Sequence, residues 1–444
     1  MQKQISREFY KYISLNVLGM LGLSCYILAD TFFISKRLGA DGLTALNLAI
    51  SVYSIINGLG LMLGIGGATR FAICRAQNET QKGNQVFTAS AAAGITVGLV
   101  LLLVGAVGSD AVAKVLGAEG VIQEMTGSYL KTILGFAPFF IMNNILIAFV
   151  RNDGSPRLSM AAMLTGSFSN IVLDYVFLFP LNMGIFGAAL ATGFAPVISL
   201  VLLSLHFIRR KNQFTWSFGF NMRAFARQVS DICSLGISAF INELSSAVVL
   251  IVFNLLILRL AGNTGVAAYG IVANLALVAV SVFTGISQGS QPLISRFYGE
   301  GRKRECTGVF LRAVLLAAGV GILFSAAAFG FTGNLVGIFN SEGNQELAKI
   351  AFWGLRLYFL GFCPAGINIV AAAFMGAVER GRESFAIAFA RGVAAILFFA
   401  FVLSFIWKMD GIWLAFPAAE VSTLLLTAGL WRRYKRGTLP AVEK

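Results

Sequence analysis

The chain has 444 residues, of which 57% are hydrophobic and only 12% are charged. A soluble domain carries roughly 25% charged residues, so this composition leaves too little polar surface for a protein that faces water on every side. The net charge of +14 comes from 34 Lys and Arg against 20 Asp and Glu. These basic residues lie between apolar runs, which is typical of cytoplasmic loops rather than of a nucleic-acid-binding surface.

Twelve apolar runs follow one another along the chain, each near or above the ~20 residues that cross a bilayer as a helix. The first run comes after a short polar start and is too long for a signal-peptide core, which predicts an uncleaved first span. The sequence therefore predicts an all-α membrane protein with twelve transmembrane helices. Their approximate limits are 12–34, 43–71, 87–107, 130–150, 158–179, 185–208, 232–260, 266–294, 309–331, 350–375, 385–407 and 412–431.

The distribution of Lys and Arg sets the expected orientation. An even number of spans places both termini on the same side of the membrane. If that side is the cytoplasm, 26 of the 34 Lys and Arg lie on it and 8 lie on the other. Because cytoplasmic loops carry the excess of basic residues, we expect a multi-pass protein of a bacterial-type inner membrane with cytoplasmic N- and C-termini.

The second half of the chain repeats features of the first at a slowly drifting offset of 223 to 227 residues. Gly42 corresponds to Gly265, the stretch 135–138 to 361–364, and the stretch 184–186 to 411–413. Six spans in each half give both halves the same orientation, which predicts parallel repeats. We expect an N-terminal lobe at 1–222, which includes a basic cytoplasmic linker at about 209–230, and a C-terminal lobe at 223–444.

The residues that carry most enzyme and metal chemistry are sparse. The five cysteines are scattered without a C-x-x-C pair, and His206 is the only histidine. This excludes a disulfide framework, a zinc site and any chemistry that needs two histidines. We predict that the chain is not an enzyme and holds no cofactor or structural metal.

Several polar residues fall inside predicted spans, where a charge is costly and usually marks a cavity or a transport pathway. Asp30, Asp174, Glu243 and Glu420 are the acidic ones. Glu243 falls near the middle of the seventh predicted span. We take Glu243, Glu420 and Asn144 as candidates for residues of a substrate cavity.

One group of these polar residues shares a depth. With a rise of ~1.5 Å per residue, Asp30, Asp174 and Thr192 lie about 6 to 10 Å from the outer ends of their predicted spans. Asn170 lies one turn from Asp174 on the same helix face. At the repeat offset Asp174 corresponds to Phe401, so the second half does not repeat this set. Carboxylate, amide and hydroxyl oxygens suit a hard cation such as Na⁺, and a buried carboxyl pair could hold a proton instead.

The same stretches resemble the multidrug and toxic compound extrusion (MATE) family, and the likeness covers nearly the whole chain. Residues 29–31 (Ala-Asp-Thr) look like the first span of that family, and 170–174 with 184–192 look like its fifth and sixth spans. Residues 291–294 (Gln-Pro-Leu-Ile) resemble its eighth span. The chain departs from some members by having no proline in the first span and no acid in the tenth, where 364–366 read Pro-Ala-Gly.

This resemblance implies two six-helix lobes arranged as a V, and antiport of Na⁺ or H⁺ against amphipathic organic cations. It implies that Asp30, Asn170, Asp174 and Thr192 form the cation-binding and coupling site, with Na⁺ as one candidate ion at Asp30 and Asp174. Glu243 matches an acidic residue of the seventh span in the family.

The predicted function is therefore multidrug or organic-cation efflux, driven by Na⁺ or H⁺ antiport with alternating access. The expected partners are amphipathic cationic small molecules and membrane lipid, with no nucleic acid, and the expected state is a monomer. An alternative is a flippase for a lipid-linked oligosaccharide or a related amphiphile, which needs several basic residues in its cavity. Within the predicted spans the candidates for such basic residues are few, with Arg259 and Arg356 near outer ends and Arg391 near an inner end. A channel, which needs no counter-ion, and a membrane enzyme are further alternatives.

Overall fold

A computed structural model of the chain describes residues 2–217, 219, 221–339 and 344–438. Two residues of the predicted linker, 218 and 220, and the C-terminal residues from 439 lie outside this set. The described part is helical throughout, with short connections and no strand. Local sequence explains this, because nearly every segment is apolar on all sides and long enough to satisfy its own backbone hydrogen bonds within lipid.

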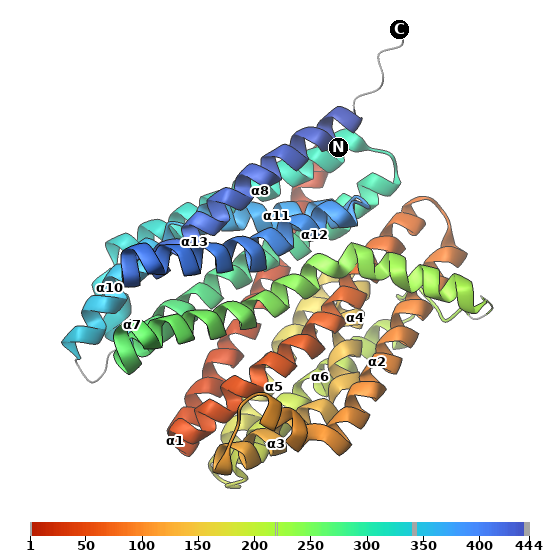
Figure 1. The fold of residues 1–444 in the computed structure, drawn as a ribbon. Helices are drawn as coiled ribbons and strands as arrows, with labels where there is room; N and C mark the ends of the chain where they lie inside the picture. The colour runs from red at the N-terminus through yellow and green to blue at the C-terminus, as the bar shows by residue number, and fades with distance from the viewer. Residues whose placement is uncertain (1, 218, 220, 340–343, 439–444) are drawn as a thin grey trace. The chain divides into compact units, whose positions relative to one another are not determined.

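The N-terminal half forms six spans. The first helix, α1, contains one residue with non-helical backbone angles, Gly39 (φ 66°, ψ −151°), and this break separates two spans. Helices α3 and α4 meet at a bend of 49° and together make one span. The helices are α1 (Gln2–Ala76), α2 (Thr80–Val115), α3 (Gly120–Gly135), α4 (Ala137–Asn152), α5 (Pro156–Leu178) and α6 (Gly184–Ile208) (Figure 1).

The C-terminal half repeats this plan. The break in α7 is at Gly262 (φ 60°, ψ −158°), which corresponds to Gly39 at the offset of 223. Helices α10 and α11 are bent by 47°, as α3 and α4 are. A third break, at Lys408 in α13, separates the last two spans. The elements are α7 (Met222–Gly299), α8 (Lys303–Gly330), α9 (Thr332–Phe339), α10 (Gln345–Phe359), α11 (Phe362–Ala377), α12 (Gly381–Phe389), η1 (Ala390–Ala394) and α13 (Ala395–Thr438).

The prediction of an all-helical protein with twelve spans is confirmed in the described part of the chain. All three breaks fall in the gaps between predicted spans. Two details differ. Helix α2 continues to Val115, beyond the predicted end at 107, because Gly108, Ser109 and Asp110 do not stop a helix that has no proline after them. The five-residue π-helix η1 has no counterpart in the prediction.

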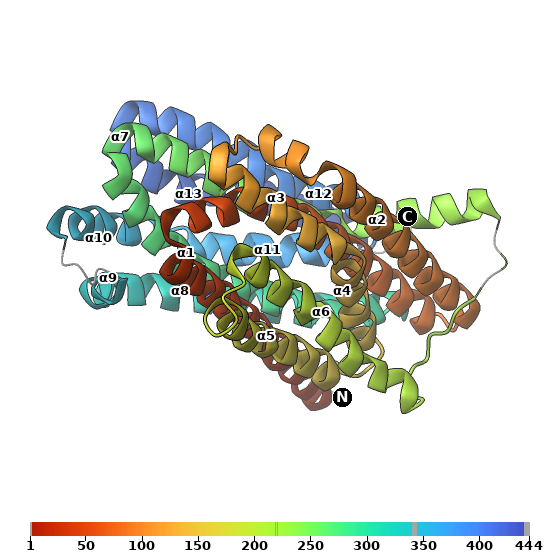
Figure 2. The same ribbon diagram turned by 90° about the horizontal axis from the view of Figure 1, so that it is seen from below.

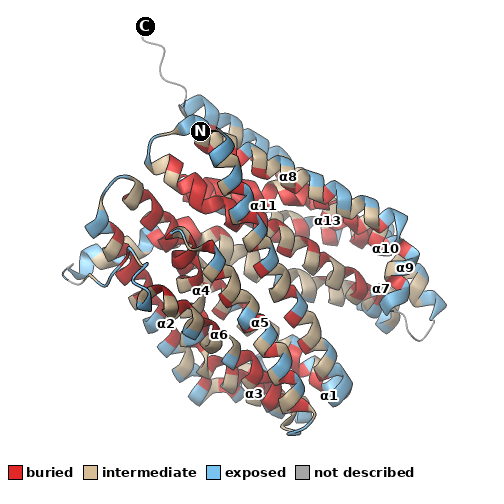
Figure 3. Ribbon diagram, turned by 180° about the vertical axis from the view of Figure 1, so that it is seen from behind, coloured by how far each residue is buried: buried red, intermediate tan, exposed pale blue. Residues whose placement is uncertain are grey.

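The contacts divide the chain into two compact units, Met1–Leu244 and Ser245–Lys444. The beginning of α7 thus belongs with α1–α6, where Gly66 packs against the Ile232 backbone. Within the first unit α5 and α6 run side by side (Figure 2). Buried residues gather where the helices of each unit meet, and exposed residues lie on the outer faces (Figure 3).

The outer faces of the helices are apolar, as a membrane protein requires. On α2, five large apolar side chains are exposed within nine residues: Leu99, Val100, Leu103, Val104 and Val107. A protein surrounded by water would bury such a run, whereas lipid tails favour it.

Small residues bring helices close together at the same place in both units. A Cβ atom at Gly98 would lie 2.6 Å from the Cα of Pro138, and one at Gly321 would lie 2.6 Å from the Cα of Cys363. Both contacts join the third span of a unit to the bend in its fourth. Close backbone approach at small residues is how membrane helices gain packing energy.

Candidate functional site

The first unit buries two carboxyl groups against each other. Asp30 lies on α1, before the Gly39 break, and Asp174 lies near the end of α5; the residues are 7% and 0% exposed. Their side chains interact directly with one another. Two ionised carboxylates in contact would repel, so the pair favours a bound proton or cation. The Oδ1 atom of each group has no hydrogen-bond partner, which leaves two buried oxygens available to a ligand.

Helices α5 and α6 add an amide and a hydroxyl to this pair. Asn170 is fully buried one turn before Asp174. In the amide orientation that satisfies both of its ends, Asn170 donates to Asp174 Oδ2 at 3.0 Å and accepts from the Thr192 N–H at 3.3 Å. The Thr192 hydroxyl donates to the Ala188 carbonyl at 3.1 Å. The four residues predicted to bind the cation thus lie together, from three different helices.

Three tyrosines that the sequence analysis did not single out surround this site. Tyr26 lies one turn before Asp30 on α1, and its hydroxyl is 2.9 Å from that of Tyr53. Tyr129, on α3, is 3% exposed and hydrogen-bonded to Thr192. All three lie close enough to Asp30 to interact with its charge. The spacing of four residues between Tyr26 and Asp30 is the one local signal that could have revealed this ring.

Two of the predicted cavity residues are joined by a third that was missed. Asn57, in the second span of α1, donates to Glu243 Oε1 at 3.0 Å. Its own oxygen accepts from Asn144 Nδ2 at 2.8 Å. Glu243, Asn57 and Asn144 therefore form a polar chain inside the first unit, drawn from α7, α1 and α4.

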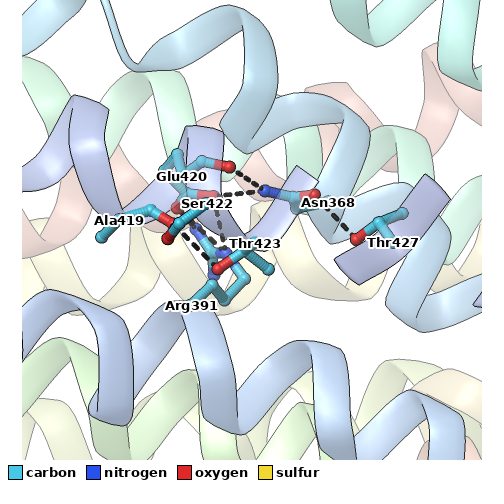
Figure 4. A network of polar contacts seen from close by, with 7 residues as sticks. All are labelled: Asn368, Arg391, Ala419, Glu420, Ser422, Thr423 and Thr427. Atoms are coloured by element: carbon cyan, nitrogen blue, oxygen red, sulfur yellow. Dashed lines mark hydrogen bonds and ion pairs between the residues drawn. The ribbon is translucent and has the colours of Figure 1, made fainter. Parts of the chain in front are cut away.

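Glu420, the remaining predicted cavity residue, lies in the second unit and is 1% exposed. Arg391 forms an ion pair with it, with Nη2 2.6 Å and Nε 3.0 Å from Oε1. Asn368 donates to Oε2 at 2.8 Å and accepts from the Thr427 hydroxyl at 2.9 Å. Figure 4 shows this network from α11, η1 and α13. The charge of Glu420 is balanced by Arg391, so this acid differs from the carboxyl pair of the first unit.

Arg391 is held by the π-helix η1, in which one extra residue widens a helical turn. Such turns are rare and occur often at functional sites. Within the described residues no group of three or more His, Cys, Asp or Glu could hold a metal ion. The site of the first unit is built from carboxyl, amide and hydroxyl groups, and that of the second unit adds the Arg391 guanidinium.

Relatives of the chain are known by sequence. The multidrug export protein MepA of Staphylococcus aureus (strain MRSA252) is 28% identical over 400 residues, which cover 89% of this chain and 86% of that protein. MepA of Staphylococcus saprophyticus is 26% identical over 398 residues, covering 89% and 86% of the two chains.

Solved structures share the fold. A MATE protein in complex with MaL6 superposes with a TM-score of 0.90 at 21% identity, covering 98% of this chain and 97% of that one. A transporter of the MOP superfamily from Pyrococcus furiosus gives 0.89 at 22% identity, with 98% and 96% covered. These likenesses confirm the two-lobed fold.

The model of one family matches the chain twice, at residues 17–176 and 239–402. The two matches fall one in each half, as the internal repeat requires, and together they cover most of the chain. With its apolar spans, its two-lobed fold and its buried carboxyl pair, the chain belongs to the MatE family, the multidrug and toxic compound extrusion transporters of the membrane.

Proposed function

We propose that this transporter exports amphipathic organic cations in exchange for Na⁺ or H⁺ that binds at Asp30 and Asp174. The observation that carries the proposal is the contact between these two buried carboxyl groups, each with one oxygen that has no partner. Two negative charges cannot remain adjacent in a dry site. A proton shared by the pair, or a Na⁺ held by the carboxyl, amide and hydroxyl oxygens, would relieve that repulsion.

Coupling would follow from competition for the same charge. A ligand shifts a conformational equilibrium only through different affinities for the two states. In the proposed cycle the outward-open state binds the ion and releases the substrate, and the inward-open state loses the ion and binds a new cation. The polar chain of Asn57, Asn144 and Glu243 supplies a further, half-buried acid for the substrate.

Multidrug export by the MepA relatives supports the substrate class. The limited number of free basic residues in the spans argues against a pyrophosphate-bearing lipid. Arg391 is paired with Glu420 at 2.6 Å, and Arg356 donates to the Thr332 hydroxyl at 3.0 Å and lies over the Phe352 ring. A flippase would need such cations exposed to its substrate.

The excess of Lys and Arg on one side supports an orientation with both termini in the cytoplasm and a location in a bacterial-type inner membrane. We further propose that the monomer is the working form of the protein, because one chain supplies all the residues of the polar networks described above. Reporter fusions at the C-terminus that are active only on the cytoplasmic side would test the orientation.

The coupling role is tested with Asp30→Asn in proteoliposomes, where efflux of an organic cation is followed under an imposed Na⁺ or pH gradient. We expect transport to lose its dependence on the coupling gradient, because the amide removes one charge of the pair. If exchange is one monovalent ion for one monovalent cation, no net charge moves and a membrane potential alone should not drive efflux.

Asp41→Asn is the matched control, because Asp41 is an exposed acid on the same helix just beyond the Gly39 break. It should transport as the unchanged protein does. Gradient-dependent efflux that survives in correctly folded Asp30→Asn protein would remove this carboxyl from the coupling step.

A further inference from the structure

The first unit contains a second polar site, away from the carboxyl pair. A cavity of about 380 Å³ lies between the beginning of α5 and the end of α6, with a contribution from the first span of α1. A cavity needs only ~10–15 Å³ of such volume to hold a water, so this space is large enough for a group of several non-hydrogen atoms. Four of its lining residues are basic: Lys11, Arg157, Arg209 and Lys211.

These four positive charges meet no acidic side chain among the residues that line the cavity. Within the described residues none of the four basic side chains takes part in an ion pair. Asp153, which contacts the cavity residue His206, has a fully buried side chain that is already engaged. It accepts from Arg75 Nη1 at 2.7 Å and from the Gln213 N–H at 2.8 Å, and it contacts His206 Nε2 at 2.8 Å.

A buried nitrogen also lines the cavity. His206 is 1% exposed and has no partner for its Nδ1 atom. At the start of α5, Pro156 has no N–H, and the Leu158 and Ser159 N–H groups donate to the Ser155 carbonyl. The attraction for an anion therefore comes from the basic side chains.

We propose that this cavity binds the phosphate of an anionic phospholipid headgroup. The shared chemistry is a phosphate anion surrounded by three or four cations, and two observations favour a lipid source over free phosphate. The cavity lies at the ends of membrane spans, where basic pockets between helices bind acidic headgroups. It is also lined by Leu158 and Leu205, which can contact the upper part of an acyl chain.

A headgroup bound in the cavity would contact the α4–α5 connection, the end of α6 and the start of α1, and would hold these three segments at the surface of the anionic leaflet. The loop before α5 includes Gly154, whose φ of 81° places Arg157 directly after a tight turn. At the end of α6, Arg210 also has a positive φ, of 49°, and the Lys211 N–H donates to the His206 carbonyl, which ends the helix in a turn. Both turns bring basic residues to the same cavity from elements that are separate in sequence.

The test uses the full chain in detergent micelles and counts bound lipid by native mass spectrometry. Phosphatidylglycerol, phosphatidylcholine and inorganic phosphate are titrated separately. Arg157→Gln/Arg209→Gln should weaken phosphatidylglycerol binding roughly 30-fold, because each cation near an anionic headgroup contributes about a fivefold factor. The matched control is Arg223→Gln/Arg227→Gln, which removes two exposed cations of the same unit outside the cavity and should change binding by less than about twofold.

Lys11→Gln/Lys211→Gln repeats the test should the arginine variant lose its fold. Tight phosphatidylglycerol binding that only the cavity variants lose supports the lipid site. Inorganic phosphate that binds as tightly, with the same loss in the variants, supports the phosphate site with a soluble source. Equal weakening in the control, equal binding of phosphatidylcholine, or no saturable binding of either anion would overturn the proposal, and none of these results depends on transport.

Discussion

Replacing Glu420 by glutamine should destabilise the second unit by about 3 kcal/mol, because it leaves Arg391 buried without its counter-charge. The side chains of the pair are only 1% and 10% exposed, so water cannot take over the role of the carboxylate. Breaking a buried pair from one side typically costs 3 to 5 kcal/mol. We expect the lower end because the new amide can still accept a hydrogen bond from Asn368.

The assay is equilibrium unfolding of the purified chain in mixed micelles with increasing sodium dodecyl sulfate, followed by tryptophan fluorescence. Glu383→Gln is the matched control, since Glu383 pairs with Arg380 at 3.3 Å and both side chains are more than a fifth exposed. Such a pair contributes less than about 1 kcal/mol.

A double variant, Glu420→Gln/Arg391→Met, separates charge from packing. Removing both charges should recover much of the lost stability, because a neutral, well-packed pair needs no desolvation. Arg391→Met alone is measured as well. The reasoning is refuted if Glu420→Gln is no less stable than Glu383→Gln, or if the stability losses of Glu420→Gln and Arg391→Met simply add in the double variant.

Three smaller predictions concern the first unit. Gly98→Ala should lower the free energy of unfolding by about 1 kcal/mol or more through overpacking. Gly108→Ala on the same helix has open space around the new methyl group, so it should raise the free energy of unfolding by about 0.5 kcal/mol. Tyr129→Phe should weaken affinity for the coupling ion up to about tenfold, measured as the half-saturating Na⁺ or H⁺ concentration, because one hydrogen bond is lost; an unchanged value would remove this hydroxyl from the site. Asn57→Ala should weaken binding of an organic cation through the loss of the contact that orients Glu243, and calorimetry that finds equal affinity would contradict this.

Much of the fold follows from the sequence because each span is specified locally. A run of about 20 apolar residues has few alternatives within a bilayer, and polar or glycine-containing gaps fix the breaks. The grouping of Asp30 with Asp174 was also predictable, since both are expensive at that depth and the helices of one half must face one another. The rise of ~1.5 Å per residue then placed both carboxyl groups at a similar depth in the membrane.

The partners of these groups could not be predicted, because side-chain pairing across helices depends on rotation about each helix axis. Nothing near Asn57 indicates that it bridges Glu243 and Asn144. Arg391 is 29 residues from Glu420, and its position depends on the wider π-helical turn, which shifts the phase of every residue after it. A regular period of 3.6 residues cannot anticipate that shift.

The breaks at Gly39 and Gly262 have a consequence for how this architecture can vary. Their backbone angles lie in a region that glycine adopts at the least cost. The third break shows that Lys408 can hold a similar conformation (φ 52°, ψ −124°), so another residue at either place would be strained rather than excluded. Both breaks have glycine at positions that correspond at the repeat offset of 223. They are therefore dependable landmarks for placing the halves of a distant sequence in register.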